Sequence, residues 1–228
     1  MFDDVSSERI VKTGWTGAVI APLTFGAWAN PDADITTQTI ISIADTAGNN
    51  DYWSIDLIST NSLMRFDVRD SVGTINSNHN TDSYAVNTWG HFAAVEENGT
   101  TRRLYADGVK VTGSTTDRTP DGADHLAIGA LIRSAKQRHF SGRIFWPFVY
   151  DTNLTDAEIL RLANGAPPNS IKPGNLVFWG HTIGDNFLDI SPGAANVMVP
   201  ENTPVMSPDI PPKVNFPGPR ARSRARAR

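Results

Sequence analysis

The sequence predicts an all-β protein, an antiparallel β-sandwich that carries one short helix and ends in an extended C-terminal arm. Short runs of β-branched and aromatic residues recur along the chain, and residues that favour turns separate them. Aspartate supplies 19 of the 24 acidic side chains, and its short side chain favours turns over helix interiors. One stretch alone combines the start, the periodicity and the stop of a helix. A chain of 228 residues is long enough to bury one sizeable core.

Four runs in the first third of the chain predict strands. They are LTFGAWA at 23–29, TIISI at 39–43, YWSIDL at 52–57 and LMRFDV at 63–68. The last run alternates apolar and polar residues after Leu63, which is the pattern of a strand with one buried face. Turn-forming residues such as Pro, Asp, Gly and Asn lie close to the ends of these runs, so we expect tight connections.

The clearest local prediction is a β-hairpin within RRLYADGVKV, residues 102–111. Asp107 and Gly108 separate two alternating runs. A two-residue type I′ turn needs positive φ at both central residues, and an Asp-Gly pair meets that need. We therefore expect two antiparallel strands joined at Asp107 and Gly108.

The one predicted helix begins after Thr155. Thr155 and Glu158 have the spacing of a capping box, in which each residue bonds the backbone N–H of the other. Gly165 and the prolines that follow it end the helix. Its apolar face consists of Ile159, Leu160, Leu162 and Ala163.

A longer stretch, NTWGHFAAVEENGTTRRLYADGVKV, resembles the hairpin of the concanavalin A-like, laminin G-like jelly rolls. In that family a Trp-x-His-hydrophobic strand precedes a Tyr-x-Asp-Gly turn, and the corresponding residues are Trp89, His91, Tyr105, Asp107 and Gly108. HLAIGA, FSGRI and VYDTNLTDAEILRLANG follow in the family's order, and NLVFWGH resembles the closing strand of pentraxins. The resemblance implies a concanavalin A-like jelly roll. Lectins, glycosidases, adhesion domains and virion proteins share this scaffold, so it does not select a function.

The resemblance spans residues 23–181 and sets the expected domain limits. We expect an N-terminal segment at 1–22, a laminin G-like jelly-roll domain at 23–198 and a proline-rich arm at 199–228. No run approaches the roughly 20 apolar residues that cross a bilayer, and the acidic opening MFDDVSSERI differs from a secretory signal. We therefore expect no membrane segment and no signal peptide. The chain has no cysteine, which excludes disulfides and thiolate metal sites.

Catalytic motifs are missing from the sequence, so we expect a protein that is not an enzyme. Glycosidases of this fold use a Glu-x-Asp-x-(x)-Glu strand, whose carboxylates act as acid and nucleophile. Adjacent residues on a strand point to opposite faces, so Glu96 and Glu97 cannot form such a pair, and we expect them to be solvated. None of the five glutamates has the required spacing: Glu8, Glu96, Glu97, Glu158 and Glu201.

Asn49, Asn50 and Asp51 form a candidate loop for a metal ion or a glycan. Pentraxins place an Asp-Asn pair in a similar loop, and calcium accepts oxygen ligands of this kind. The resemblance implies a second, acidic loop after the Ile-Gly strand, but residues 130–139 are basic here. We therefore expect a polar turn at these three residues and no cofactor, with calcium as the alternative.

The aromatic residues divide into two expected groups. Trp15 and Trp53 are expected near a rim, where an indole ring can stack on a sugar. The histidines are scattered without the spacing of metal ligands. Four other tryptophans lie in strand-like runs and are expected in the core: Trp28, Trp89, Trp146 and Trp179.

The chain ends in an arginine ladder at Arg220, Arg222, Arg224, Arg226 and Arg228. Without these five arginines, the other residues hold 15 basic and 24 acidic side chains, a net charge of −9. An extended arm places alternate residues on one side, so the five guanidinium groups would face one acidic surface. That surface is another protein chain in our first interpretation. Nucleic acid is a weaker candidate, because the rest of the chain is acidic.

Two functions follow from these observations. The first is a non-enzymatic structural and binding protein, which displays a lectin-like jelly roll on a virion and is anchored by its arm. Its partners would be capsid or other virion proteins, in an oligomeric assembly made in the host cytoplasm. The alternative is a carbohydrate-binding module whose loops at 49–51 and 76–82 hold a glycan, with an incidental basic tail. An enzymatic function is a third hypothesis, which the sequence favours less than these two.

Overall fold

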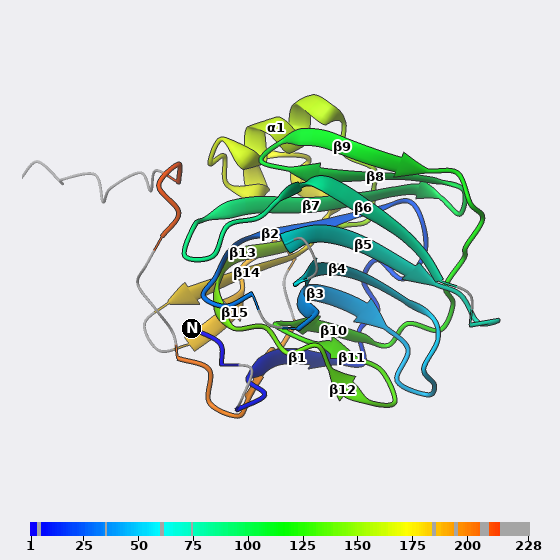
Figure 1. Ribbon diagram of the computed structural model, residues 1–228, viewed down its shortest axis with the longest axis horizontal. Helices are drawn as coiled ribbons and strands as arrows, with labels where there is room; N and C mark the ends of the chain where they lie inside the picture. The colour runs from blue at the N-terminus through cyan, green and yellow to red at the C-terminus, as the bar shows by residue number, and fades with distance from the viewer. Residues whose placement is uncertain are drawn as a thin grey trace, which may run out of the picture.

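The structure is a computed structural model that describes residues 1–3, 6–34, 36–59, 62–73, 75–183, 186–193, 196–205 and 210–214 (Figure 1). Two seven-stranded antiparallel sheets form a sandwich. In spatial order, the first sheet contains β16 (Val199–Glu201), β1 (Arg9–Thr13), β10 (His125–Ile128), β3 (Gln38–Ala44), β4 (Tyr52–Ile58), β5 (Leu63–Arg69) and β6 (Ile75–Ser83). The second contains β15 (Asn186–Asp189), β14 (Leu176–Ile183), β13 (Gly142–Tyr150), β2 (Leu23–Pro31), β7 (Gly90–Asn98), β8 (Thr101–Ala106) and β9 (Val109–Ser114).

The main core lies between the two sheets, where alternate residues of each strand turn inward. Phe25 of β2 meets Phe66 of β5 edge to face, with ring centroids 5.6 Å apart. Each aromatic side chain buried in this way removes a large apolar area from water, which favours the folded state. This core fixes the faces of the first sheet, because residues beside the inward ones must point outward.

A second core covers the outer face of the second sheet, beneath α1 (Asp156–Ala163) and two short 3-10 turns, Pro168–Ser170 and Pro173–Asn175. Figure 1 shows α1 next to β8 and β9. The capping box predicted for Thr155 is confirmed, because its hydroxyl accepts from the Glu158 N–H at 3.3 Å. The predicted hairpin is also confirmed, with φ of 50° at Asp107 and 82° at Gly108.

The sandwich extends beyond the expected domain limits at both ends. β1 lies within the predicted N-terminal segment, yet it pairs with β10 and β16 in the first sheet. Ile10 and Val11 bring two buried apolar side chains to this strand, which explains its place in the sheet. β16 lies at the start of the predicted arm and forms the edge beside β1.

Two predictions about side chains are wrong. Trp15 and Trp53 do not lie at a rim, since they are 2% and 1% exposed and belong to the main core. Glu96 is not solvated, since it is 1% exposed and accepts hydrogen bonds from Arg102 and from the Trp53 indole N–H. The inner face of β4 carries Trp53 toward Glu96, so the indole and the carboxylate satisfy each other inside the sandwich.

The other tryptophans follow the prediction more closely. Trp28, Trp146 and Trp179 are buried, at 3%, 5% and 6% exposure. Trp89 is half-buried and packs against the second core.

No helix in the described ranges has the length and apolar character that a membrane-crossing segment requires.

Candidate functional site

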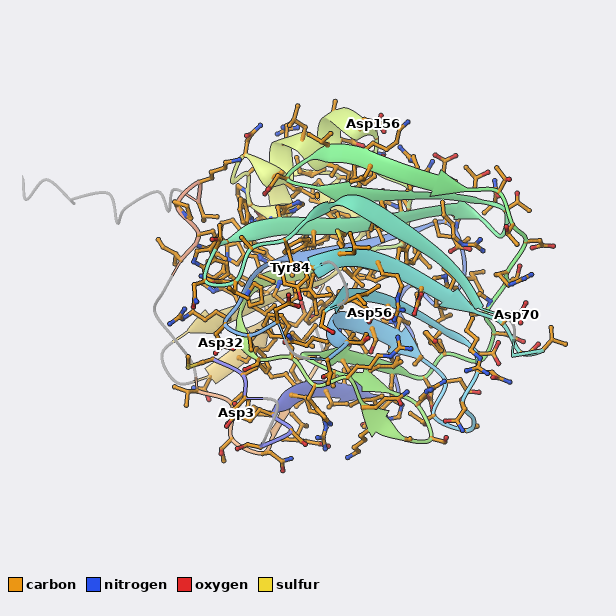
Figure 2. All side chains as sticks on the ribbon, in the orientation of Figure 1. Asp3, Asp32, Asp56, Asp70, Tyr84 and Asp156 are labelled. Carbon is orange, nitrogen blue, oxygen red and sulfur yellow. The ribbon has the colours of Figure 1, made fainter. Side chains whose placement is uncertain are left out.

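Two buried carboxylates mark the outer face of the first sheet. Asp56 on β4 and Asp67 on β5 are 0% and 1% exposed. Their strand neighbours Ile55 and Phe66 point into the main core, so both carboxylates point away from it. Figure 2 labels Asp56 among the strands of the first sheet. Buried charges are costly unless they are paired, and this pair has specific partners.

Two arginines hold these carboxylates. Arg138 Nη1 lies 2.6 Å from Asp56 Oδ2 and 3.1 Å from Asp67 Oδ2. Arg65 Nη2 lies 2.9 Å from the Oδ2 atom of each aspartate. The Thr39 hydroxyl donates to Asp56 Oδ1 at 2.6 Å. Burial alone would lower the pKa of Arg138, but the two carboxylates outweigh it and raise that pKa.

Arg138 reaches the sheet from a hairpin that folds over it. β11 (Leu131–Ile132) and β12 (Lys136–Gln137) form this hairpin. Leu131 packs on Ala44 and Tyr52, and the Ser42 hydroxyl donates to the Ala130 carbonyl at 2.8 Å. The hairpin therefore rests on the outer face of the strands that carry the carboxylates. Directly after β12, Arg138 has a left-handed backbone with φ of 54°.

The predicted loop at Asn49 joins the same hairpin. The Asn49 carbonyl accepts a hydrogen bond from Arg133. Its side-chain oxygen accepts from the Ser134 hydroxyl at 2.6 Å. The Arg133 guanidinium in turn lies over the Tyr52 ring, 5.4 Å from its centroid. The structure thus brings together two loops that the family resemblance had singled out, and basic and amide groups connect them.

The other two residues of the predicted loop do not gather around a common point for a cation. Asn50 donates to the Ser71 carbonyl at 3.0 Å. Asp51 is 8% exposed and accepts the backbone N–H of Asp121 at 3.1 Å. Burial raises the pKa of Asp51, and nearby carboxylates add to this effect. Across the described residues, no three His, Cys, Asp or Glu side chains are placed to hold a metal ion.

A polar pocket of about 440 Å³ opens beside Arg138. Three polar atoms on the same sheet face are buried without a hydrogen-bond partner in the described part of the chain: Tyr52 Oη, Ser54 Oγ and Arg65 Nε. The pocket is lined by Thr36, Thr37, Gln137, Arg138 and His139.

Asp56 and Asp67 are a carboxylate pair that sequence reasoning missed. Both accept from the same nitrogen of Arg138, so their Oδ2 atoms lie no further apart than the sum of the two distances, about 5.7 Å. Retaining glycosidases separate their two carboxyl groups by about 5 to 5.5 Å. Each Oδ2 atom here is already shared by two guanidinium groups. Acid and nucleophile roles need at least one free carboxyl, which this network does not offer.

A second pocket, of about 370 Å³, lies where the first and second sheets meet at one end. Tyr84, which Figure 2 labels, forms part of its wall. The Tyr84 hydroxyl donates to Asp34 at 2.7 Å. Most of its lining is apolar or aromatic, unlike the pocket beside Arg138. Its lining residues are Met64, Tyr84, Ala85, Thr88, Trp89, Gly90, Phe92, Ala106, Asp107 and Val109.

Two further segments were predicted to bind a partner, and the described residues include only one of them. Residues 76–82, predicted as a glycan-binding loop, are part of strand β6. The arginine ladder lies outside the described residues, so its contacts stay a prediction. Its members are Arg220, Arg222, Arg224, Arg226 and Arg228.

Comparison with known families decides the classification. Residues 12–160 match the model of the concanavalin A-like lectin/glucanases superfamily, which is more than half of the chain. The chain belongs to this superfamily. The match agrees with the resemblance seen in the hairpin around Asp107 and Gly108 and with the sandwich of two antiparallel sheets. A search of curated proteins found no match to this chain in sequence.

Solved structures with the same architecture are distant in sequence. The carbohydrate-binding module CBM40 of Ruminococcus gnavus IT-sialidase, bound to alpha2,3 sialyllactose, has 14% identity and a TM-score of 0.56, covering 63% of this chain and 83% of its own. A heptameric SAP-like pentraxin from Limulus polyphemus has 15% identity and a TM-score of 0.54, covering 86% and 95%. A carbohydrate binding protein of Bacteroides ovatus, itself described as putative, has 15% identity and a TM-score of 0.57, covering 80% and 53%. At these identities the likeness shows the fold alone.

Proposed function

We propose that this chain is a non-catalytic carbohydrate-binding protein whose glycan occupies the pocket beside Arg138. The proposal rests on the outer face of the first sheet, where two buried aspartates hold Arg65 and Arg138, and Arg138 lines a polar pocket. Such networks of buried charge are costly to build and often mark functional sites. Hydroxyl, amide, guanidinium and imidazole groups line the pocket and suit the hydroxyl groups of a sugar.

The comparisons support this proposal at the level of the family. The superfamily is described by its lectins and glucanases, and one of the similar structures is a carbohydrate-binding module with a bound glycan. A non-catalytic role is favoured because each Oδ2 atom of Asp56 and Asp67 is shared by Arg65 and Arg138. A binding site can use fixed, fully paired groups, whereas acid catalysis needs a carboxyl that can transfer a proton.

A blocking experiment tests the proposal and its position. Thr36 and Thr88 are both exposed, and each lines one of the two pockets. Glycan-array screening of the full chain should give hits, and calorimetry should then show at least a tenfold loss of affinity in Thr36→Trp. Thr88→Trp is the matched control and should keep the affinity of the original chain. The proposal fails if no glycan binds, and the pocket assignment fails if only Thr88→Trp loses binding.

We further propose that the C-terminal arm attaches the chain to a larger assembly, with a virion as the first candidate. Charge supports it, since five arginines follow a remainder of net charge −9. The structures compared above do not bear on this proposal. Co-sedimentation with particles from its source tests it, comparing the full chain with a chain ending at Val214, which keeps β16 and the buried Val214 but lacks the five arginines. Only the full chain should co-sediment, and added salt should release it; equal behaviour of the two chains contradicts the proposal.

A further inference from the structure

We infer that the pocket beside Arg138 binds the carboxylate of an acidic sugar, such as a sialic or uronic acid. This inference rests on the proposed carbohydrate-binding function and specifies its ligand class. It comes from the donors that Arg138 leaves open, from the charge balance of the sheet face and from the composition of the pocket wall.

The open edge of Arg138 is the first argument. All of its hydrogen bonds within the described residues use Nη1, which is shared between Asp56 and Asp67. Nε and Nη2 donate to no described residue, and the side chain is 18% exposed. These two nitrogens form the side of a guanidinium that binds a carboxylate through two parallel hydrogen bonds. Arg138 also lines the pocket, so a ligand there would lie beside this side chain.

Preorganisation is the second argument. The two aspartates fix the Nη1 side of Arg138, so a carboxylate on the other side meets a guanidinium that is already oriented. Little side-chain entropy is then lost on binding. The left-handed backbone at Arg138, with φ of 54°, is unusual for a residue other than glycine. Strained backbone of this kind persists where surrounding contacts hold it and often occurs at ligand sites.

The charge balance of the sheet face is the third argument. Arg65 and Arg69 point outward from β5, and Arg133 and Arg138 reach the same face from the hairpin. Two carboxylates, Asp56 and Asp67, lie among them. Burial lowers the pKa of Arg133, and the nearby guanidinium groups of Arg138 and Arg69 lower it further. An anion bound near these arginines would offset their mutual repulsion.

The wall of the pocket is the fourth argument. Its lining includes one guanidinium and one imidazole, and none of the described residues that line it has a carboxylate that would repel an acid. Thr36, Thr37 and Gln137 add hydroxyl and amide groups that can bond the hydroxyl groups of the same sugar. A neutral sugar would use these groups but would leave the open edge of Arg138 without a charged partner. An acidic sugar uses both.

Paired ligands test the inference on the full chain. Calorimetry is done with 3′-sialyllactose against lactose, and with trigalacturonate against galactotriose, so that the two sources of a sugar carboxylate are separated. A charge-assisted hydrogen bond contributes about 1.5–3 kcal/mol, so the acidic member of at least one pair should bind about 10- to 100-fold more tightly. Its methyl ester should lose this gain, and added salt should weaken the binding.

Arg138→Lys gives the matched protein control. A lysine keeps a cation for Asp56 and Asp67 but has no two-pronged edge. The variant should lose at least tenfold affinity for the acidic ligand and keep its affinity for a neutral one. This inference is overturned if acidic and neutral ligands bind equally well, or if the methyl ester binds as tightly as the acid. Either result leaves the proposed function standing. Absence of binding to all ligands and to a glycan array overturns both. The ester result does not depend on whether the variant folds.

Discussion

Replacing Arg102 with methionine should destabilise the sandwich by about 3–5 kcal/mol, the cost of leaving a buried charge without its partner. Arg102 binds Glu96 through Nε at 2.9 Å and Nη2 at 3.0 Å, and both side chains are at most 1% exposed. The guanidinium also donates to the carbonyls of Gly99, Thr116 and Arg118 at 2.7, 2.5 and 2.5 Å. Methionine fills a similar volume but satisfies none of these groups.

The loss should depend on pH in a defined direction. Burial already raises the pKa of Glu96, and Arg102 opposes that rise. Without Arg102, the folded chain would bind a proton on Glu96 more tightly than the unfolded chain does. A raised carboxyl pKa makes the folded state more stable as pH falls through that pKa. Arg102→Met should therefore recover part of its stability, relative to the original chain, between pH 7.5 and pH 5.

Urea denaturation followed by tryptophan fluorescence measures both effects. For a chain of this length, the loss corresponds to a fall in Tm of roughly 6–20 °C. The double variant Glu96→Gln with Arg102→Met removes the stranded charge, so it should be more stable at pH 7.5 than Arg102→Met alone. Lys110→Met, half-exposed and 3.8 Å from Asp156, is the control and should change stability by less than about 0.5 kcal/mol. A loss below about 1 kcal/mol for Arg102→Met, or a double variant weaker than the single one, would refute this reasoning.

Three further predictions concern pH, a turn and a metal. Burial lowers the pKa of His91 to about 3. The free energy of unfolding should therefore fall by up to about 1.4 kcal/mol per pH unit as pH drops from 6.5 toward 3. His91→Phe should flatten this slope in urea denaturation. Gly108→Ala should cost about 1–2 kcal/mol in thermal melts, because φ is 82° and the new Cβ would lie 2.9 Å from Leu160 Cδ1, whereas Gly48→Ala should cost less. EDTA should leave glycan binding unchanged in calorimetry, because Arg133 and Ser134 already bond the oxygens of Asn49; a loss of binding would restore the calcium alternative.

Local signals in the sequence predicted the fold well. The Asp107–Gly108 turn and the Thr155 cap depend on residues close in sequence, so their chemistry is visible without a structure. The burial of Trp53 and Glu96 was missed, because the prediction treated Glu96 as a surface residue rather than as a partner of an indole across the core. A buried carboxylate becomes favourable only once its partners are known, and those partners come from other strands.

The candidate site was missed for a related reason. Asp56 and Arg138 are separated by 82 positions, and no local pattern joins them. A weak signal was present, since charged residues alternate in β5 at Arg65, Asp67 and Arg69 and Asp56 lies in the run before it. Alternating charges on two consecutive predicted strands place those charges on one face of a sheet. What covers that face depends on a distant hairpin, which only the three-dimensional structure supplies.

The basic hairpin gives the departure from the pentraxin pattern a physical meaning. The resemblance implied acidic ligands at 130–139, and the chain has Arg133 and Arg138 there instead. Carboxylates in that loop would favour a cation, whereas guanidinium groups favour an anion on the same sheet face. In our proposal the open edge of Arg138 therefore binds the ligand, in place of a bound calcium ion. If that exchange is correct, ligand binding should be insensitive to calcium and sensitive to salt, and these two properties separate it from a calcium-dependent lectin.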